Sequence, residues 1–332
     1  MVASVVGILS NKGGVGKTHL ATSLALALAQ RGKKILLIDA DWSSANVTRK
    51  LGLTPPRTLR QYFNDECSVA DLIAPTPHHP NLYILAGSPG EFGIANMDQA
   101  HKLRLLTAFR EIAAHSKGDY IFFDLGAGVE ARTLDTALAA DYPLVVTTPQ
   151  DILSGYGCLK ALLYRFLDLI AQRPSWFVSP QFRPMLVVNQ VIDPGQGKVV
   201  ANAMRNLLRE YANERAARDP EIVQYFQRIP VVGGGKRVSM SDDPVIADSS
   251  HDPSTGVEVM CDLRFLGEVP HAREKFITAE MNRTPFLLAF PNNPAAMAIR
   301  QLADNLTGES LTPAPLVQSS GFWQRLAELM TT

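Results

Sequence analysis

The chain has 332 residues, enough for one large α/β domain or two small ones. Its 32 Lys and Arg residues balance its 32 Asp and Glu residues, which argues against a protein that mainly coats nucleic acid. Its 3 cysteines lie far apart and form no C-x-x-C pair, so a disulfide framework is excluded and the cytoplasm is the expected compartment. The sequence contains no signal-peptide pattern and no apolar run of about 18 residues that would span a membrane.

Short apolar runs, interrupted by segments with helical spacing, recur along most of the chain. The runs predict buried parallel strands at Ser4–Leu9, Ile35–Asp39, Asn81–Leu85, Tyr120–Asp124, Leu144–Thr148 and Met185–Asn189, with weaker candidates at Arg264–Val269 and Phe286–Phe290. Helical spacing predicts helices at Thr18–Arg31, Asp98–His115, Leu159–Gln172 and Val199–Asn213. This alternation predicts an α/β fold: a doubly wound, mostly parallel sheet with helices on both faces.

The rhythm of strands and helices breaks near residue 215. The segment Arg215–Val259 is rich in Gly, Pro, Ser and Asp, and we interpret it as an irregular insertion into a single domain of residues 1–307. Residues 308–319 have the composition of a linker, and residues 320–332 form a predicted amphipathic helix. The insertion is the expected site for an activating or cargo protein.

A phosphate-binding loop follows the first predicted strand. Residues Lys12–Thr18 read KGGVGKT and open the first predicted helix, which is the context that this motif requires. The glycines allow backbone N–H groups to surround phosphate oxygens, while Lys17 would contact the β- and γ-phosphates and the Thr18 hydroxyl would bind Mg²⁺. A turn that merely joins strand to helix would need neither side chain.

Acidic residues end two of the predicted strands. Asp39 and Asp41 close the run ILLIDAD, and Asp124 closes YIFFD. Ligands of open parallel sheets bind beyond the carboxyl ends of the strands, so we expect these three acids beside the phosphate loop. One could hold Mg²⁺ through water and another could orient an attacking water molecule.

The additional lysine, Lys12, together with the DAD sequence at Asp39–Asp41, resembles the deviant Walker A ATPases of the MinD/ParA family. The FlhG (FleN/YlxH) branch is the most similar, in the segments Asp39–Leu53, Phe122–Gly128, Val187–Val191, Phe265–Pro270 and Thr284–Ala303. The resemblance implies a P-loop NTPase fold of the MinD type that binds and hydrolyses ATP with Mg²⁺. It also implies an ATP-dependent homodimer that positions or counts a cellular structure, with flagellar placement as the leading example.

The resemblance also implies roles for individual residues. Lys12 would reach the phosphates bound by the other subunit and act with Lys17, while Asp41 would position the hydrolytic water. Mg²⁺ would be served by Thr18, Asp39 and, in the Walker B role, Asp124. The expected nucleotide contacts are Gly13, Gly14, Val15, Gly16, Lys17, Thr18, His19, Asn189 and Pro270. The aspartate that such proteins often carry after VVTTP is not evident in Asp151–Gly157, which reads DILSGYG.

The last predicted helix has one apolar face. That face consists of Phe322, Trp323, Leu326, Leu329 and Met330. MinD-like proteins end in an amphipathic helix that lies on the membrane, so reversible binding at the inner face of the membrane is one hypothesis. The alternative is that the helix docks on its own domain or on a partner protein.

Other functions occur on the same fold. ParA-like partitioning of chromosomes or cargo is the principal alternative, and it leaves a role for nucleic acid open. A metal-cluster carrier would need paired cysteines at a dimer interface, and a metabolic ATP-dependent ligase would need a substrate pocket. The sequence alone does not distinguish which cellular structure is positioned.

Overall fold

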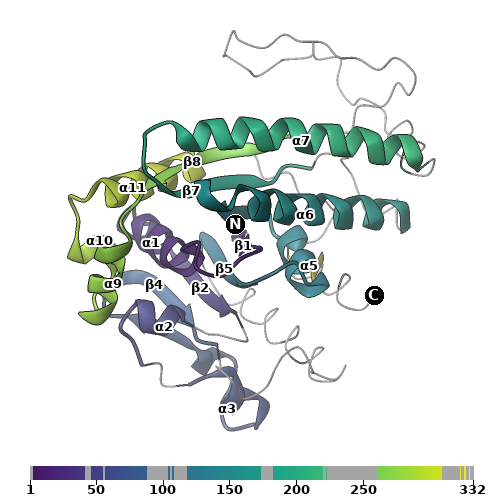
Figure 1. The fold of residues 1–332 in the computed structure, drawn as a ribbon. Helices are drawn as coiled ribbons and strands as arrows, with labels where there is room; N and C mark the ends of the chain where they lie inside the picture. The colour runs from purple at the N-terminus through teal and green to yellow at the C-terminus, as the bar shows by residue number, and fades with distance from the viewer. Residues whose placement is uncertain are drawn as a thin grey trace.

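The computed structural model describes residues 3–41, 46–54, 57–87, 118–172, 182–219 and 261–308, with Arg104, Thr107, Ile222, Phe322, Arg325, Leu326 and Leu329. These residues build an eight-stranded sheet with the order β3-β4-β2-β5-β1-β6-β7-β8 (Figure 1). The strands are β1 (Ser4–Ser10), β2 (Ile35–Ala40), β3 (Ile73–Thr76), β4 (His79–Leu85), β5 (Tyr120–Ala127), β6 (Tyr142–Thr147), β7 (Met185–Val191) and β8 (Arg264–Pro270). Each strand is parallel to its neighbours except β3, which runs antiparallel to β4 at the edge.

Helices connect the strands and cover both faces of the sheet (Figure 1). They are α1 (Lys17–Gln30), α2 (Val47–Lys50), α3 (Leu59–Phe63), α5 (Ala131–Ala139), α6 (Ile152–Gln172), α7 (Gln196–Arg218), α9 (Arg273–Met281), α10 (Phe286–Ala289) and α11 (Pro294–Thr307). Short 3₁₀ turns lie at Ala70–Leu72 and Pro149–Asp151.

Side chains of each strand alternate between two separate hydrophobic clusters. Along β1, Val5 and Leu9 pack with α5, α6 and α7, whereas Val6 and Ile8 pack with α1, α9, α10 and α11. Because both faces are covered, the strands carry continuous apolar runs instead of alternating polar ones. The predicted doubly wound α/β fold is confirmed.

Most of the predicted elements are present, with two errors at the edges. The weak candidate Arg264–Val269 is strand β8, but Phe286–Phe290 is not a strand, because Pro285 precedes a single helical turn, α10. Phe286 and Leu287 are adjacent and both buried on the same side, which strand alternation would not allow. The edge strand β3 was missed because it has just 4 residues and contains Pro75.

The predicted helices are recovered with shifted ends. Helix α6 begins at Ile152, earlier than the predicted Leu159, and α7 extends to Arg218. The insertion therefore does not begin at Arg215, which lies in the last turn of α7 with its guanidinium over the Tyr164 ring. The rest of the predicted insertion lies outside the described residues except Ile222, as does the predicted helix Asp98–His115 except Arg104 and Thr107.

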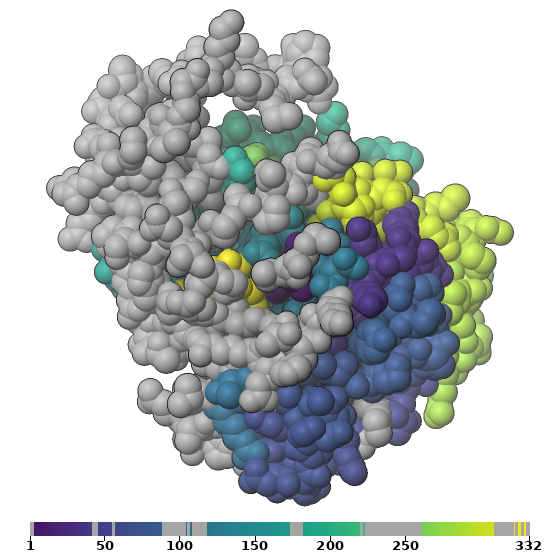
Figure 2. Space-filling view, turned by 180° about the vertical axis from the view of Figure 1, so that it is seen from behind, coloured from purple at the N-terminus to yellow at the C-terminus, as the bar shows by residue number. Residues whose placement is uncertain are grey.

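Helix α11 lies beside α1, although the two are far apart in sequence. Arg31 at the end of α1 forms a bidentate ion pair with Asp304 of α11, with N–O distances of 2.5 and 2.7 Å. Figure 2 shows this proximity from behind, where the yellow segment near the carboxyl end adjoins the purple amino-terminal elements. Helix α11 therefore helps to hold α1, the predicted nucleotide-binding helix, in place.

Three residues of the predicted C-terminal apolar face are described, and all three are buried against the chain itself. Phe322, Leu326 and Leu329 join the cluster on the α5–α6 side of the sheet, and the Phe322 ring lies 5.0 Å from that of Phe123. Arg325, only 4% exposed, donates to the Ala139 carbonyl at 2.8 Å and forms an ion pair of 2.6 Å with Asp141. These residues therefore follow the alternative to membrane binding, in which the last helix docks on its own domain. Trp323 and Met330 lie outside the described residues.

Within the part of the chain that the structure describes, none of the helices is both long enough and apolar enough to cross a bilayer.

Candidate functional site

The phosphate loop joins the central strand β1 to helix α1. Gly14 and Gly16 have left-handed backbone conformations, with φ of 85° and 92°, which glycine adopts without strain. A Cβ atom on Gly16 would lie 2.3 Å from Nδ2 of Asn189, so the loop also needs glycine for space. The loop leads into helix α1, which begins at Lys17. The backbone N–H groups in the first turn of α1 have no intrahelical partner, and they face the cavity over the loop.

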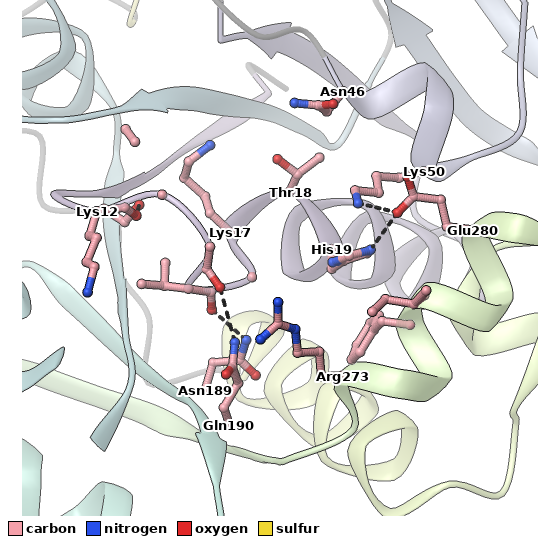
Figure 3. Close-up of a pocket in the computed structure, with 18 of the residues that line it drawn as sticks. Lys12, Lys17, Thr18, His19, Asn46, Lys50, Asn189, Gln190, Arg273 and Glu280 are labelled. Atoms are coloured by element: carbon pink, nitrogen blue, oxygen red, sulfur yellow. Dashed lines mark hydrogen bonds and ion pairs between the residues drawn. The ribbon is translucent and has the colours of Figure 1, made fainter. Parts of the chain in front are cut away.

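A cavity of about 360 Å³ opens over this loop (Figure 3). Its lining combines Lys12–His19 with side chains from the ends of β1, β2, β5 and β7 and from helices α2 and α9. Among the predicted site residues, the lining includes Lys12, Gly13, Gly14, Val15, Gly16, Lys17, Thr18, His19, Asp41 and Asn189. Three predicted site residues, Asp39, Asp124 and Pro270, are not part of the lining; Ala272 and Arg273, just after Pro270, are.

Lys17 and Asp124 form a buried ion pair at the floor of the site. Lys17 Nζ lies 2.8 Å from Asp124 Oδ1, and the two side chains are 7% and 0% exposed. Burial raises the pKa of Asp124, whereas Lys17 and the Thr18 hydroxyl lower it. The second oxygen, Oδ2, is buried and has no hydrogen-bond partner among the described residues. A buried carboxylate oxygen without a partner costs free energy that a cation or its water shell would recover.

Asp39 lies next to Asp124 in register but makes different contacts. Its Oδ1 accepts from the Asp41 N–H at 3.3 Å, and its Oδ2 accepts from the Val47 N–H at 3.0 Å. Burial raises the pKa of Asp39 to about 7 despite these two bonds. The carboxylate therefore fixes both the position of Asp41 and the start of α2.

Lys12 points away from the loop toward helix α6. Its Nζ lies 2.6 Å from Asp151 Oδ1, and its side chain is 58% exposed. The sequence reasoning did not predict this ion pair, although Asp151 stands just after the run VVTTP. We missed it because the pairing depends on the 3₁₀ turn Pro149–Asp151, which places the carboxylate beside the phosphate loop.

Asn189 and Gln190 reach the phosphate loop from the end of β7 (Figure 3). Asn189 Nδ2 donates to the Val15 carbonyl at 2.7 Å, and Gln190 Nε2 donates to the Gly14 carbonyl at 3.3 Å. Gln190 has a left-handed φ of 62°, which is uncommon for a residue other than glycine. In this arrangement Asn189 braces the loop, and Gln190 is a lining residue that the sequence reasoning missed.

The opposite wall contains charged and aromatic side chains that were also not predicted. Arg273, Phe276 and Glu280 come from α9, and Arg49 and Lys50 come from α2. The pKa of His19 is lowered to about 4, mainly by burial and by Lys50, so its imidazole is neutral at pH 7. Only the position of α9 after strand β8, at the carboxyl edge of a parallel sheet, could have indicated these residues.

A glycine-rich loop opening a helix, a buried lysine and carboxylates at the neighbouring strand ends define a P-loop nucleotide-binding site. In the part of the chain that the structure describes, no three His, Cys, Asp or Glu side chains gather closely enough to hold a metal ion. An ion here would take most of its ligands from nucleotide phosphates, water and the Thr18 hydroxyl, which is the usual manner for Mg²⁺.

Comparisons with known proteins agree with this class. A family model described as AAA domain matches residues 3–174. The antiactivator FleN of Pseudomonas aeruginosa is 32% identical over 160 residues, which cover 48% of this chain and 56% of FleN. The flagellum site-determining protein YlxH of Helicobacter pylori is 31% identical over 218 residues, covering 63% of this chain and 73% of YlxH.

Solved structures show the same fold. The MinD cell division protein of Aquifex aeolicus has a TM-score of 0.58 and 21% identity, covering 93% of this chain and 99% of its own. The septum site-determining protein MinD of Pyrococcus horikoshii, complexed with Mg-ADP, has a TM-score of 0.53 and 19% identity, covering 93% and 97%. The chain belongs to the AAA-domain family and, within it, to the MinD/ParA-type P-loop ATPases of the FlhG-like branch, which use ATP and Mg²⁺.

Proposed function

We propose that this chain is a dimerisation switch driven by ATP binding and hydrolysis, and that it positions or counts a cellular structure. The observation that carries the proposal is the placement of Lys12. Its ammonium group lies at the rim of the nucleotide cavity, largely exposed, while Lys17 occupies the floor. A lysine directed out of its own site is suited to reach a nucleotide held by a second subunit.

Within one subunit, the role of each residue near the nucleotide follows from its position. Lys17 would exchange Asp124 for the β- and γ-phosphates, and Asp41 would orient the attacking water at the cavity wall. Thr18 would bind Mg²⁺ directly, while Asp124 and Asp39 would hold its water shell. The unpartnered Oδ2 of Asp124 supports that assignment. When bound, Mg²⁺ would neutralise phosphate charge.

Phosphoryl transfer needs mainly positioning and charge neutralisation. In a dimer, Lys12 would add positive charge at the γ-phosphate of the other subunit, in the manner of an arginine finger. Before dimerisation, the ion pair with Asp151 holds this lysine on its own subunit. Dimer formation would therefore exchange Asp151 for a phosphate as the partner of Lys12.

Membrane binding would require the C-terminal segment to leave its place. Phe322, Leu326 and Leu329 are buried on the sheet, so the same apolar face cannot contact lipid while it is docked. We propose that any contact with the inner face of the membrane follows undocking of this segment. An activating or cargo partner at residues 215–259 stays a prediction.

We propose flagellar placement as the particular role, as the name of YlxH, a flagellum site-determining protein, suggests. The name of FleN, an antiactivator, specifies no cellular structure, and the MinD relatives are named septum site-determining proteins. The metal-cluster alternative finds no support in the cysteines, because such a cluster needs paired cysteines and the 3 in this chain form no C-x-x-C pair. Cys158 and Cys261 are free thiols buried in the core.

Two measurements test the proposal. Asp41→Ala should slow hydrolysis and allow a dimer to accumulate with ATP but not with ADP, as measured by light scattering after size exclusion. Deleting the gene in the source cell should change the number or position of flagella seen by electron microscopy. A monomer under all nucleotide conditions would refute the switch; a normal flagellar pattern with altered chromosome partitioning would favour the ParA-like role.

A further inference from the structure

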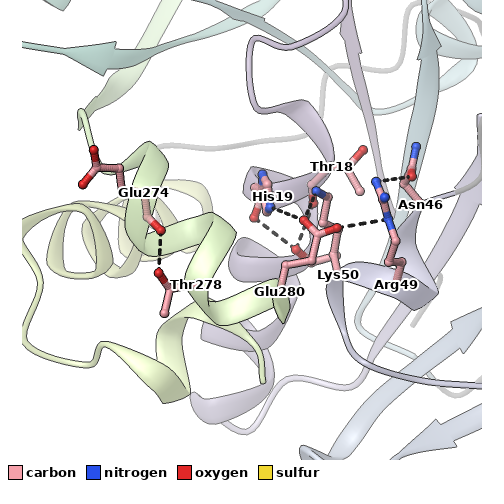
Figure 4. Close-up of polar contacts among 9 residues, drawn as sticks. Thr18, His19, Asn46, Arg49, Lys50, Glu274, Thr278 and Glu280 are labelled. Carbon is pink, nitrogen blue, oxygen red and sulfur yellow. Dashed lines mark hydrogen bonds and ion pairs between the residues drawn. The ribbon is translucent and has the colours of Figure 1, made fainter. Parts of the chain in front are cut away.

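One wall of the nucleotide cavity carries a compact group of three charged side chains and the neutral His19 imidazole, which we call the Glu280 cluster: His19, Arg49, Lys50 and Glu280 (Figure 4). The Glu280 carboxylate forms an ion pair with Lys50 and accepts a contact of 3.0 Å from Nε of Arg49. His19 Nε2 lies 3.5 Å from the same carboxylate. One side chain of α9 thus meets the first turn of α1 and both cations of α2.

The ion pair at the centre of the cluster is mostly shielded from water, because the side chains of Lys50 and Glu280 are 13% and 18% exposed. The Arg49 side chain is 64% exposed. Lys50 and Arg49 hold the pKa of Glu280 below its ordinary value against the opposing effect of burial. Charged pairs at this degree of burial have stronger geometric preferences than pairs on an open surface.

Helix α2 is attached at its other end to the predicted catalytic carboxylates. Asp39 accepts from the Val47 N–H, the first residue of α2, and from the Asp41 N–H. Arg49 also donates to the Asn46 side chain at 2.8 Å, just before the helix. Since α2 has only 4 residues, its contacts with Glu280 and with Asp39 lie about one helical turn apart.

Helix α9, which carries Glu280, forms part of the cavity wall. Arg273 and Phe276 line the cavity, and the Phe276 ring lies 4.8 Å from the His19 ring and 3.8 Å from that of Phe286. A second contact joins the same two helices. A Cβ on Gly52, just after α2, would lie 2.4 Å from the Arg283 carbonyl oxygen, just after α9.

We propose that Glu280 is a positioning residue of the nucleotide site, holding α2 and α9 together so that the wall of the cavity and Asp41 adopt one arrangement. It acts through Lys50 and Arg49, not by touching the reacting phosphate. Nucleotide bound along α9 would thereby affect the position of the Asp41 carboxylate, which we propose orients the attacking water. The contacts that carry this role lie within one subunit, so the role does not require dimerisation.

The test uses the full chain and separates binding from hydrolysis. Glu280→Gln should raise the Kd for Mg-ADP, measured by titration calorimetry, about five- to tenfold. It should also lower the hydrolysis rate at saturating ATP, because Asp41 moves with α2. Glu274→Gln is the matched control: Glu274 lies on the same helix, exposed and turned away from the cluster, and should leave both quantities unchanged (Figure 4).

Lys50→Met breaks the Lys50–Glu280 contact from the α2 side. It provides a second measurement if Glu280→Gln folds poorly. Each single change should raise the Kd, and the double variant should raise it by less than the product of the two effects, because both changes break the Lys50–Glu280 contact. The proposal is overturned if Glu280→Gln lowers only the thermal midpoint of the nucleotide-free protein, with the Kd within about twofold of the original. Multiplicative effects of the two changes on the Kd would also overturn it.

Discussion

Replacing Lys12 by Ala should separate nucleotide binding from dimerisation. In one subunit the change removes a single ion pair, Lys12–Asp151, whose lysine side chain is 58% exposed. Exposed pairs of this kind contribute about 0–1 kcal/mol, so the nucleotide-free protein should lose almost no stability. The affinity of the monomer for ADP should also change little, because Lys17 and the loop backbone remain.

The same change should have a large effect on the proposed dimer. There, each Lys12 would be taken out of water against a phosphate group of the other subunit. Removing one partner of such a desolvated pair costs about 2–5 kcal/mol, and a symmetric dimer contains the contact twice. We therefore expect the dimer to weaken at least about a thousandfold, since each 1.4 kcal/mol is a factor of ten.

The assay is sedimentation equilibrium with ATP in an Asp41→Ala background, with calorimetric titration of ADP alongside. Asp151→Asn is the matched control, because it breaks the same ion pair while keeping the lysine, and it should dimerise at least as well as the original protein. A Lys12→Ala protein that dimerises normally would refute the reasoning. Loss of ADP binding in that variant would refute it too, since Lys12 would then serve its own subunit.

Two further predictions concern stability. Arg325→Ala should lower the free energy of unfolding, measured in urea, by about 3–5 kcal/mol, because the Asp141 carboxylate and the Ala139 carbonyl lose Arg325 as their partner. The control Arg209→Ala, at an exposed residue, should change this free energy by less than about 0.5 kcal/mol. Burial raises the pKa of Asp39 to about 7, so the stability that its protonated form contributes is lost as the pH rises toward and through 7. The melting temperature of the nucleotide-free protein, minus that of Asp39→Asn, should therefore fall between about pH 4 and pH 7 and level off at higher pH. A difference that stays constant over this range would contradict the assignment.

The sequence predicted the sheet because its strands are continuous apolar runs that end in small or acidic residues. The run ILLIDA and the run YIFFD both place an aspartate at the carboxyl edge, and the structure pairs these two residues in register. The phosphate loop was equally accessible, since motif and context occupy consecutive residues. Such signals are local, so no knowledge of packing was needed.

The contacts between distant segments could not be predicted in the same way. Glu280 meets His19 and Lys50 across more than half of the chain, and no spacing rule relates them. Lys12 and Asp151 likewise meet only because β1 and β6 are neighbours in the sheet. The apolar face of the last helix was visible in the sequence, but what covers it is a property of the folded sheet.

Asp141 joins the first strand of the sheet and the segment around Arg325 through one carboxylate. One oxygen accepts from the Val5 N–H at 2.8 Å, and the other binds Arg325. Proteins leave the ribosome amino terminus first, so β1 emerges well before Arg325 does. Until Phe322 and Arg325 have emerged and docked, the Phe123 side of the sheet would lack part of its cover and would be open to chaperones and proteases.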